Sequence, residues 1–169
     1  TLVEQGIGLD VSSGLELQQA LQNNPDNIVF SGPGKGVEEL KLAVENSDCV
    51  TVLLDSLNEL DRLENIAGEY GTRINAGIRL TTNEKSIWKK FGIPLDSLES
   101  AFLNASKCQH VNLCGIQFHL SWNLTPAQHI RFIRRLGTKL QNMAFDQRRN
   151  IKFIDIGGGF WPEEGEWLQ

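Results

Sequence analysis

The chain has 169 residues, which is enough for one domain with a hydrophobic core, and its 16 basic and 21 acidic side chains give a formal net charge of −5. No block of basic residues stands out, which argues against a nucleic-acid partner, and no apolar run approaches the roughly 18 residues of a membrane span. The three cysteines lack metal-type spacing and suit a reducing compartment, so we expect a cytoplasmic protein that contacts no membrane.

Apolar segments rich in β-branched residues alternate with helical patterns along the whole chain. In chain order, the sequence predicts strands at residues 6–13, 27–32, 49–56, 73–80, 113–121 and 151–157, and helices at residues 14–24, 37–46, 57–70, 96–106 and 125–148. We expect Asp96 to cap the fourth helix, and Thr125 to cap the fifth, with Pro126 in its first turn.

The alternation of strand and helix, without hairpin signals, predicts parallel strands joined by right-handed crossovers. Six strands and five helices fit two α/β architectures. One is an open, doubly wound sheet, and the other is a (β/α)₈ barrel of which this chain holds only some units.

Polar residues follow five of the predicted strands. These segments are residues 10–13, 31–35, 55–56, 119–121 and 155–159. Because the carboxyl ends of parallel strands share one edge of the sheet, these residues are expected to surround a polar ligand.

Three consecutive glycines, Gly157, Gly158 and Gly159, end the last predicted strand. Backbone N–H groups without neighbouring Cβ atoms can form a concave site for a phosphate, although a flexible turn would have the same composition. His119 is by its position either a packed core residue or a catalytic one. By the same standard, Lys35 is most often a solvated loop lysine.

The order of the segments "GLDVSSGLEL", "NIVFSGPGK", "LLDSLNELDRL", "RINAGIRL", "KKFGI", "GIQFHLS" and "FIDIGGGF" resembles the barrel domain of the alanine-racemase-like, pyridoxal-phosphate-dependent decarboxylases. This family includes the diaminopimelate, ornithine and arginine decarboxylases, and the resemblance runs from Gly6 to Phe160. It implies an incomplete pyridoxal-phosphate-binding (β/α)₈ barrel from an enzyme that removes CO₂ from a basic or diamino acid.

Three alternatives remain open beside the decarboxylase. The same barrel serves in pyridoxal-phosphate-dependent racemases and in non-catalytic carriers of the cofactor. A phosphate-binding barrel without pyridoxal chemistry would also explain the glycines.

The resemblance also implies roles for individual residues. It assigns the cofactor phosphate to Gly157, Gly158 and Gly159, and it places His119, as a catalytic residue, against one face of the pyridine ring. It further implies that Asp55 and Arg73 line the barrel mouth and bind the cofactor. Other matches to family motifs are Ser13, Glu16, Lys35 and the segment from Lys90 to Gly92.

One segment departs from the family pattern. The family reads "HIGS" after the histidine strand, whereas this chain has His119, Leu120, Ser121 and Trp122. Either Ser121 supplies the hydroxyl that contacts the phosphate, or the indole of Trp122 reshapes the pocket for a different substrate.

The resemblance finally implies what surrounds this segment. No segment here matches the family's strand with the Schiff-base lysine or its C-terminal β-domain. We therefore expect residues 1–169 to be part of a single barrel domain in a longer enzyme, and to be inactive alone. The whole enzyme is expected to be a homodimer that acts on an amino acid.

Overall fold

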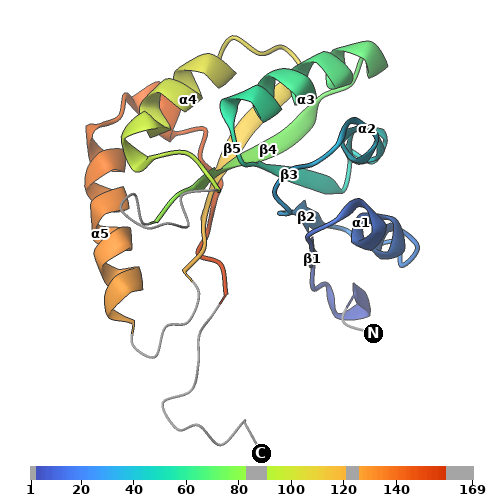
Figure 1. The fold of residues 1–169 in the computed structure, drawn as a ribbon, viewed down its shortest axis with the longest axis horizontal. Coiled ribbons are helices and arrows are strands. Elements are labelled where there is room, and N and C mark those ends of the chain that lie inside the picture. Colours follow the sequence, from blue (N-terminus) through green and yellow to red (C-terminus); the bar gives the residue numbers. More distant parts are fainter. Residues whose placement is uncertain (1–2, 83–90, 121–125, 159–169) are drawn as a thin grey trace, which may run out of the picture.

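The computed structural model describes residues 3–82, 91–120 and 126–158. Within them, six strands form one parallel sheet in the order β1-β2-β3-β4-β5-β6 (Figure 1). The strands are β1 (Leu9–Val11), β2 (Ile28–Phe30), β3 (Val50–Leu54), β4 (Ile74–Leu80), β5 (Val111–Phe118) and β6 (Phe153–Asp155). All six predicted strands are confirmed, and each is shorter than predicted, mainly because residues at its ends belong to turns and helix caps.

The order of the strands decides between the two predicted architectures. A doubly wound sheet reverses its strand order at a switch point, whereas here every strand pairs with the next one along the chain. Helices α1 to α5 lie in an arc around the outer face of the curled sheet, and the inner face carries none of them (Figure 1). The described chain is therefore an arc of an α/β barrel, open between β1 and β6.

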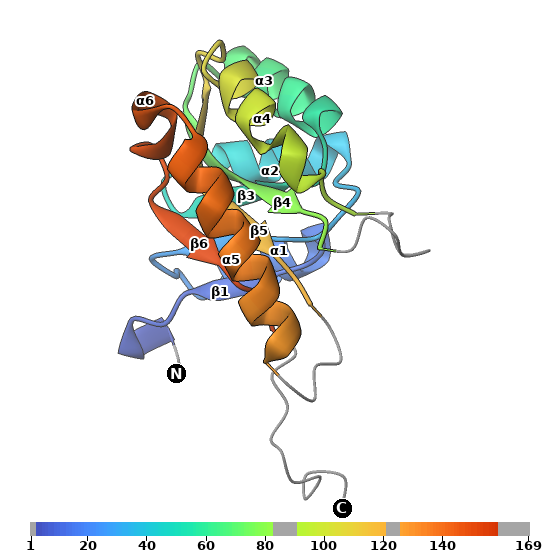
Figure 2. The same ribbon diagram turned by 90° about the vertical axis from the view of Figure 1, so that its left-hand side faces the viewer.

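The described helices differ from the prediction in two places. They are α1 (Gly14–Leu21), α2 (Val37–Glu45), α3 (Leu57–Tyr70), α4 (Leu98–Ala105), α5 (Ala127–Asn142) and α6 (Phe145–Arg148), with short 3₁₀ turns at Val3–Gln5 and Leu95–Ser97. The single helix predicted for residues 125–148 is wrong, because Met143 and Ala144 adopt extended backbone and Met143 turns into the core. Figure 2 shows α6 beyond the end of α5.

The second difference lies at the start of α4. Asp96 is not its N-cap, because a 3₁₀ turn precedes the helix and places Ser97 at that position, without a side-chain cap. The prediction that Thr125 caps the fifth helix falls outside the described residues. Pro126 stands directly before α5, in keeping with the expected start of that helix.

The main hydrophobic core lies between the outer face of the sheet and the helices. Because side chains alternate along a strand, every second residue of each strand points outward, as Phe30, Ile78 and Phe118 do, and each of these is at most 2% exposed. Leu17 on α1 and Leu63 on α3 meet this face and are fully buried. Each buried leucine contributes about 1.5–3 kcal/mol by the removal of its apolar surface from water.

The inner face of the sheet is packed differently. Gly77, Gly115 and Phe153 are register neighbours on β4, β5 and β6. A Cβ on Gly115 would overlap the Phe153 ring, and one on Gly77 would come within 3.1 Å of it. The two glycines therefore make room for an aromatic ring inside the barrel arc, and this ring lies beneath the carboxyl ends of the strands.

Candidate functional site

A cavity of about 600 Å³ lies at the carboxyl ends of the strands, where a barrel binds its ligand. Five strands of the sheet, or the loops that follow them, supply its walls. It is lined by Asp10, Ser12, Ser31, Pro33, Arg79, Gln117, His119, Asp155, Gly157 and Gly158. The expected gathering of polar groups at this edge is therefore present in the described residues.

Three polar side chains form a row across the cavity. Arg79 on β4 is in register with Gln117 on β5, which is in register with Asp155 on β6. Each stands two residues beyond the row of Gly77, Gly115 and the Phe153 ring, so both rows face the inside of the arc. The neutral amide of Gln117 thus has the cation of Arg79 on one side and the anion of Asp155 on the other.

His119 lies beside the glycine turn after β6. Gly157 has φ of +68°, and a Cβ there would come within 2.8 Å of His119 Nδ1 and of the Phe118 carbonyl oxygen, so only glycine fits. The Gly158 N–H points at His119 Nδ1 over a long 3.4 Å, and a Cβ on Gly158 would meet no atom within 4 Å. The backbone at Gly158 is therefore open to a ligand.

Asp10 and Ser31 make the opposite wall of the cavity. Ser31 Oγ donates a hydrogen bond to Asp10 Oδ1 at 2.5 Å. Partial burial raises the pKa of Asp10 above its ordinary value of 3.8, the Ser31 hydrogen bond opposes this rise, and the negative charge of Asp155 adds to it. Asp10 and Asp155 thus place two carboxyl groups in the lining of the cavity.

Asp55 stands at the end of β3, as expected, but it contacts protein groups and not the cavity. Its Oδ1 lies 3.8 Å from Arg79 Nη1 and accepts a hydrogen bond from the Gly92 N–H at 3.0 Å. The Arg79 guanidinium also lies 5.2 Å from the centre of the Phe91 ring. Asp55 and the Phe91-Gly92 pair thus hold Arg79 in place, while partial burial raises the pKa of Asp55 in spite of the nearby guanidinium.

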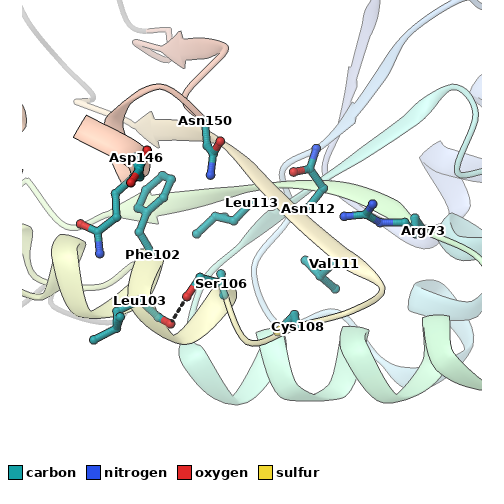
Figure 3. A pocket seen from close by; sticks show the side chains of 12 residues that line it. Arg73, Phe102, Leu103, Ser106, Cys108, Val111, Asn112, Leu113, Asp146 and Asn150 are labelled. Carbon is teal, nitrogen blue, oxygen red and sulfur yellow. Dashed lines mark hydrogen bonds between the residues drawn. The ribbon is translucent and has the colours of Figure 1, made fainter. Parts of the chain in front are cut away.

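Arg73 is not at the barrel mouth, and that expectation is wrong. It directly precedes β4 and therefore lies at the amino end of the strand, roughly 20 Å from the carboxyl end at about 3.3 Å per residue. There it lines a separate hollow of about 380 Å³ with Asn112, Asp146 and Asn150 (Figure 3). Arg79 occupies the mouth, and its place at the end of "INAGIRL" was the sequence signal for it.

Other residues that match family motifs serve the structure. Ser13 caps α1, with its Oγ accepting from the Glu16 N–H at 3.2 Å, while Glu16 accepts from the Ser12 N–H at 2.6 Å. Lys35 is 2% exposed and donates to the Leu53 carbonyl oxygen at 2.6 Å, so it is not a solvated loop lysine. Burial lowers the pKa of Lys35 below 10.5, although the negative charge of Glu59 opposes the shift.

Three glutamates order the loops around the cavity, and of these the sequence analysis named only Glu16, without this role. Glu16, Glu39 and Glu59 each occupy the third position of a helix, in α1, α2 and α3. Glu39 accepts from the N–H groups of Gly36 and Gly14, both at 2.7 Å, and Glu59 accepts from the Asp55 N–H at 2.7 Å. A glutamate at the third position of three successive helices is a pattern that the sequence contains, but it can be recognised only when the first residue of each helix is known.

Gln117 was also missed. Its side chain lines the cavity, and its Oε1 is buried without a hydrogen-bond partner in the part of the chain that the structure describes. Two expected site residues, Ser121 and Gly159, lie outside the described residues, as do Lys90 of the matched family motif and Trp122. The roles of the described candidates in binding stay predictions.

The fold and the cavity define a barrel protein that binds a polar ligand at the carboxyl ends of its strands. Residues 1–166 match the family model described as "Pyridoxal-dependent decarboxylase, pyridoxal binding domain", and the chain belongs to that family. The resemblance found in the sequence is thereby confirmed. No helix within the described residues is long and apolar enough to cross a membrane.

Several individual proteins that this chain resembles are diaminopimelate decarboxylases. The chain is 30% identical to a diaminopimelate decarboxylase of Aquifex aeolicus over 98% of its length, and 29% identical to one of Pseudomonas aeruginosa over 94%. Among solved structures, a diaminopimelate decarboxylase from M. jannaschii in co-complex with L-lysine superposes with a TM-score of 0.74 at 25% identity, over 96% of this chain. The chain covers 43%, 41% and 42% of these three proteins, respectively.

The residues present fit pyridoxal phosphate. Gly158 offers a backbone N–H beside open space, where a Cβ would occupy a ligand's position, and Gly157 can hold this turn only as glycine. The flat imidazole of His119 is exposed at the same rim. Arg79 supplies a positive charge on the side of Gln117 away from Asp155. Such a charge can pair with an anionic oxygen of the cofactor, on either the ring or the phosphate.

Proposed function

We propose that the complete protein is a pyridoxal-phosphate-dependent decarboxylase that removes CO₂ from a basic or diamino acid. The observation that carries this proposal is the cavity in which the glycine turn, His119 and Arg79 surround one polar space in a chain of the pyridoxal-binding family. Two relatives are diaminopimelate decarboxylases, and the solved relative holds L-lysine, the product of that decarboxylation.

The chain's own residues would bind and orient the reactants. The cofactor, when bound, accepts the electron pair that the departing carboxylate leaves behind. The Gly157 N–H donates to Asp155 at 2.7 Å, so in the turn of Gly157 and Gly158 the Gly158 N–H would hold the phosphate and Gly157 would shape the turn. His119 would support one face of the ring, and Arg79 would neutralise an anionic oxygen. Asp55 fixes Arg79 for this task by an ion pair at 3.8 Å.

The charge of the cavity supports a substrate with a second amino group. Asp10 and Asp155 both line it. Burial first, and then the negative charge of Asp155, raise the pKa of Asp10 above 3.8. A bound ammonium group would relieve this repulsion and form a charge-assisted hydrogen bond. A substrate without a cationic side chain would leave it in place.

We further propose that residues 1–169 belong to one barrel domain and that the complete protein is a cytoplasmic homodimer. The barrel arc leaves the strand edges of β1 and β6 unpaired within the described residues, so they are available to further chain. The three cysteines, an odd number without metal-type spacing, support a reducing compartment. Light scattering on the complete protein would measure its oligomeric state, and a monomer would contradict the proposal.

The function is tested on the complete protein by an absorption spectrum with pyridoxal phosphate, before and after borohydride reduction. We expect a band of bound cofactor that reduction fixes to the protein, followed by CO₂ release from diaminopimelate, lysine, arginine or ornithine. Loss of optical activity without CO₂ would identify a racemase, and cofactor binding without turnover a carrier. No bound cofactor would overturn the pyridoxal proposal.

A further inference from the structure

The side chain of Gln117 on β5 has a buried polar atom without a hydrogen-bond partner. The residue is 6% exposed, and its Oε1 is buried without a hydrogen-bond partner among the described residues. A buried amide oxygen without a partner costs about 1–3 kcal/mol. Native proteins leave few such atoms, and those that exist often mark a place where a ligand or water binds.

The neighbours of Gln117 in the sheet do not satisfy it. Arg79, its register partner on β4, lies beside Asp55 at 3.8 Å and over the Phe91 ring. Asp155, its partner on β6, accepts the Gly157 N–H at 2.7 Å. Each flanking charge therefore has its own protein partner, whereas the Gln117 Oε1 between them has none among the described residues.

The packing around Gln117 leaves one direction for a partner. Toward the amino end of the strands, the Phe153 ring fills the space over Gly77 and Gly115. Toward the carboxyl end, Gln117 lines the cavity together with His119, which directly follows β5. A group that completes the hydrogen bonds of the amide must therefore enter from the cavity.

We propose that Gln117 is a cofactor-contacting residue, whose amide hydrogen-bonds a polar ring substituent of pyridoxal phosphate bound in this cavity. This inference rests on the proposed function and adds a residue to its site. A primary amide carries both an acceptor and donors, and rotation of the amide exchanges them. It can therefore bind a ring hydroxyl in either protonation state, while Arg79 and Asp155 are each suited to only one.

The test compares two glutamines in the complete protein. Gln147 also has a buried Oε1 without a partner, but it lines the hollow at the amino end of the strands. We expect Gln117→Leu to raise the dissociation constant of pyridoxal phosphate about 5–10-fold, from the loss of one hydrogen bond. It should also shift the pH at which the absorption band of the bound cofactor titrates. Gln147→Leu should change neither quantity.

Several outcomes would overturn the inference. One is an unchanged dissociation constant and titration for Gln117→Leu; another is a lower melting temperature of the cofactor-free protein with unchanged binding, which would assign the amide to a protein partner. If the leucine variant does not fold, Gln117→Glu keeps the shape and removes the N–H donors. Its affinity should fall as its carboxyl group ionises, and a pH profile like that of the wild type would count against the proposal. Wild-type protein that binds no pyridoxal phosphate would overturn the proposed function itself, before any variant is made.

Discussion

Lys35 and Glu59 form an ion pair inside the protein, with Lys35 Nζ 3.5 Å from Glu59 Oε1 and both side chains at most 2% exposed. Lys35 comes from the loop after β2, and Glu59 from the first turn of α3. Lys35 also donates to the Leu53 carbonyl oxygen, and Glu59 accepts the Asp55 N–H. The pair thus joins the ends of two strands next to the residue that holds Arg79.

Removal of the lysine charge should destabilise the fold. Lys35→Met leaves the Glu59 carboxylate buried without its cation, at an expected cost of about 3–5 kcal/mol. The double variant Lys35→Met, Glu59→Gln should lose less than the sum of the two single variants, because no buried charge remains. Urea unfolding of the four proteins measures this difference, and additive losses would show that the two groups do not interact.

A pH-dependent contribution is expected from Glu64. It accepts hydrogen bonds from the backbone N–H groups of Gln109, His110 and Val111 at the start of β5. Partial burial would raise the pKa of Glu64, but these hydrogen bonds outweigh burial and lower the pKa below 4.5. The native state therefore favours the ionised form.

Glu64→Gln should lower the free energy of unfolding by about 2 kcal/mol at neutral pH. Because the folded pKa is depressed, the wild-type advantage is complete above the unfolded value of 4.5 and disappears as the pH falls through the folded pKa. Denaturant unfolding across this range measures it. Glu69→Gln, at an exposed site of the same helix, serves as the control and should cost little at any pH.

The glycine under the Phe153 ring should not tolerate a methyl group. Gly115→Ala places a Cβ inside the ring's volume, so we expect a loss of about 1–3 kcal/mol or more from overpacking. Gly137→Ala is the matched control, because a Cβ there meets no atom within 4 Å and the residue lies within α5. It should be neutral or stabilising by up to about 1 kcal/mol. Similar melting temperatures for both variants would contradict this account of the packing.

Alanine substitutions at the two described glycines after β6 should affect different properties, stability at one and cofactor binding at the other. Gly157→Ala forces a side chain into the left-handed region at φ of +68° and against His119, so it should destabilise the protein by about 1–2 kcal/mol. Gly158→Ala should leave stability unchanged, because its Cβ would project into open space. In the same space the Cβ would obstruct the phosphate, so the affinity for pyridoxal phosphate should fall about tenfold, or 1.4 kcal/mol.

Calorimetry of cofactor-free protein separates the first effect from the second. Pyridoxal without the phosphate provides the control ligand, since its weaker binding should not respond to Gly158→Ala. Equal weakening of both ligands would argue that this turn does not hold the phosphate.

The two arginines of the β4 region offer a direct comparison. Arg79→Met should weaken binding of pyridoxal phosphate about tenfold, because it removes the cation of the cavity. Arg73→Met, at the opposite end of the strand, should leave binding unchanged. Equilibrium dialysis measures both, and a larger effect at Arg73 would reverse the assignment made from the structure.

The sequence by itself determined the six strands, most of the helices, the parallel pairing and the family. These follow from patterns within short segments: apolar runs for strands, helical spacing in residues 57–70, which match α3 residue for residue, and motifs such as "FIDIGGGF". Gly157, Gly158 and His119 could be found in the same way, because a glycine run and a polar strand end are local signals. All three lie at the cavity.

The tertiary structure decided what depends on pairing between distant segments. Strand order separated the barrel from the doubly wound sheet, and register put Arg79, not Arg73, beside Gln117 and Asp155. The burial of Lys35 likewise came from α3, 24 residues away. A sequence pattern predicts on which face of its strand a residue lies. Only the packing of other segments against that face determines whether it meets solvent, a counter-charge or a ligand.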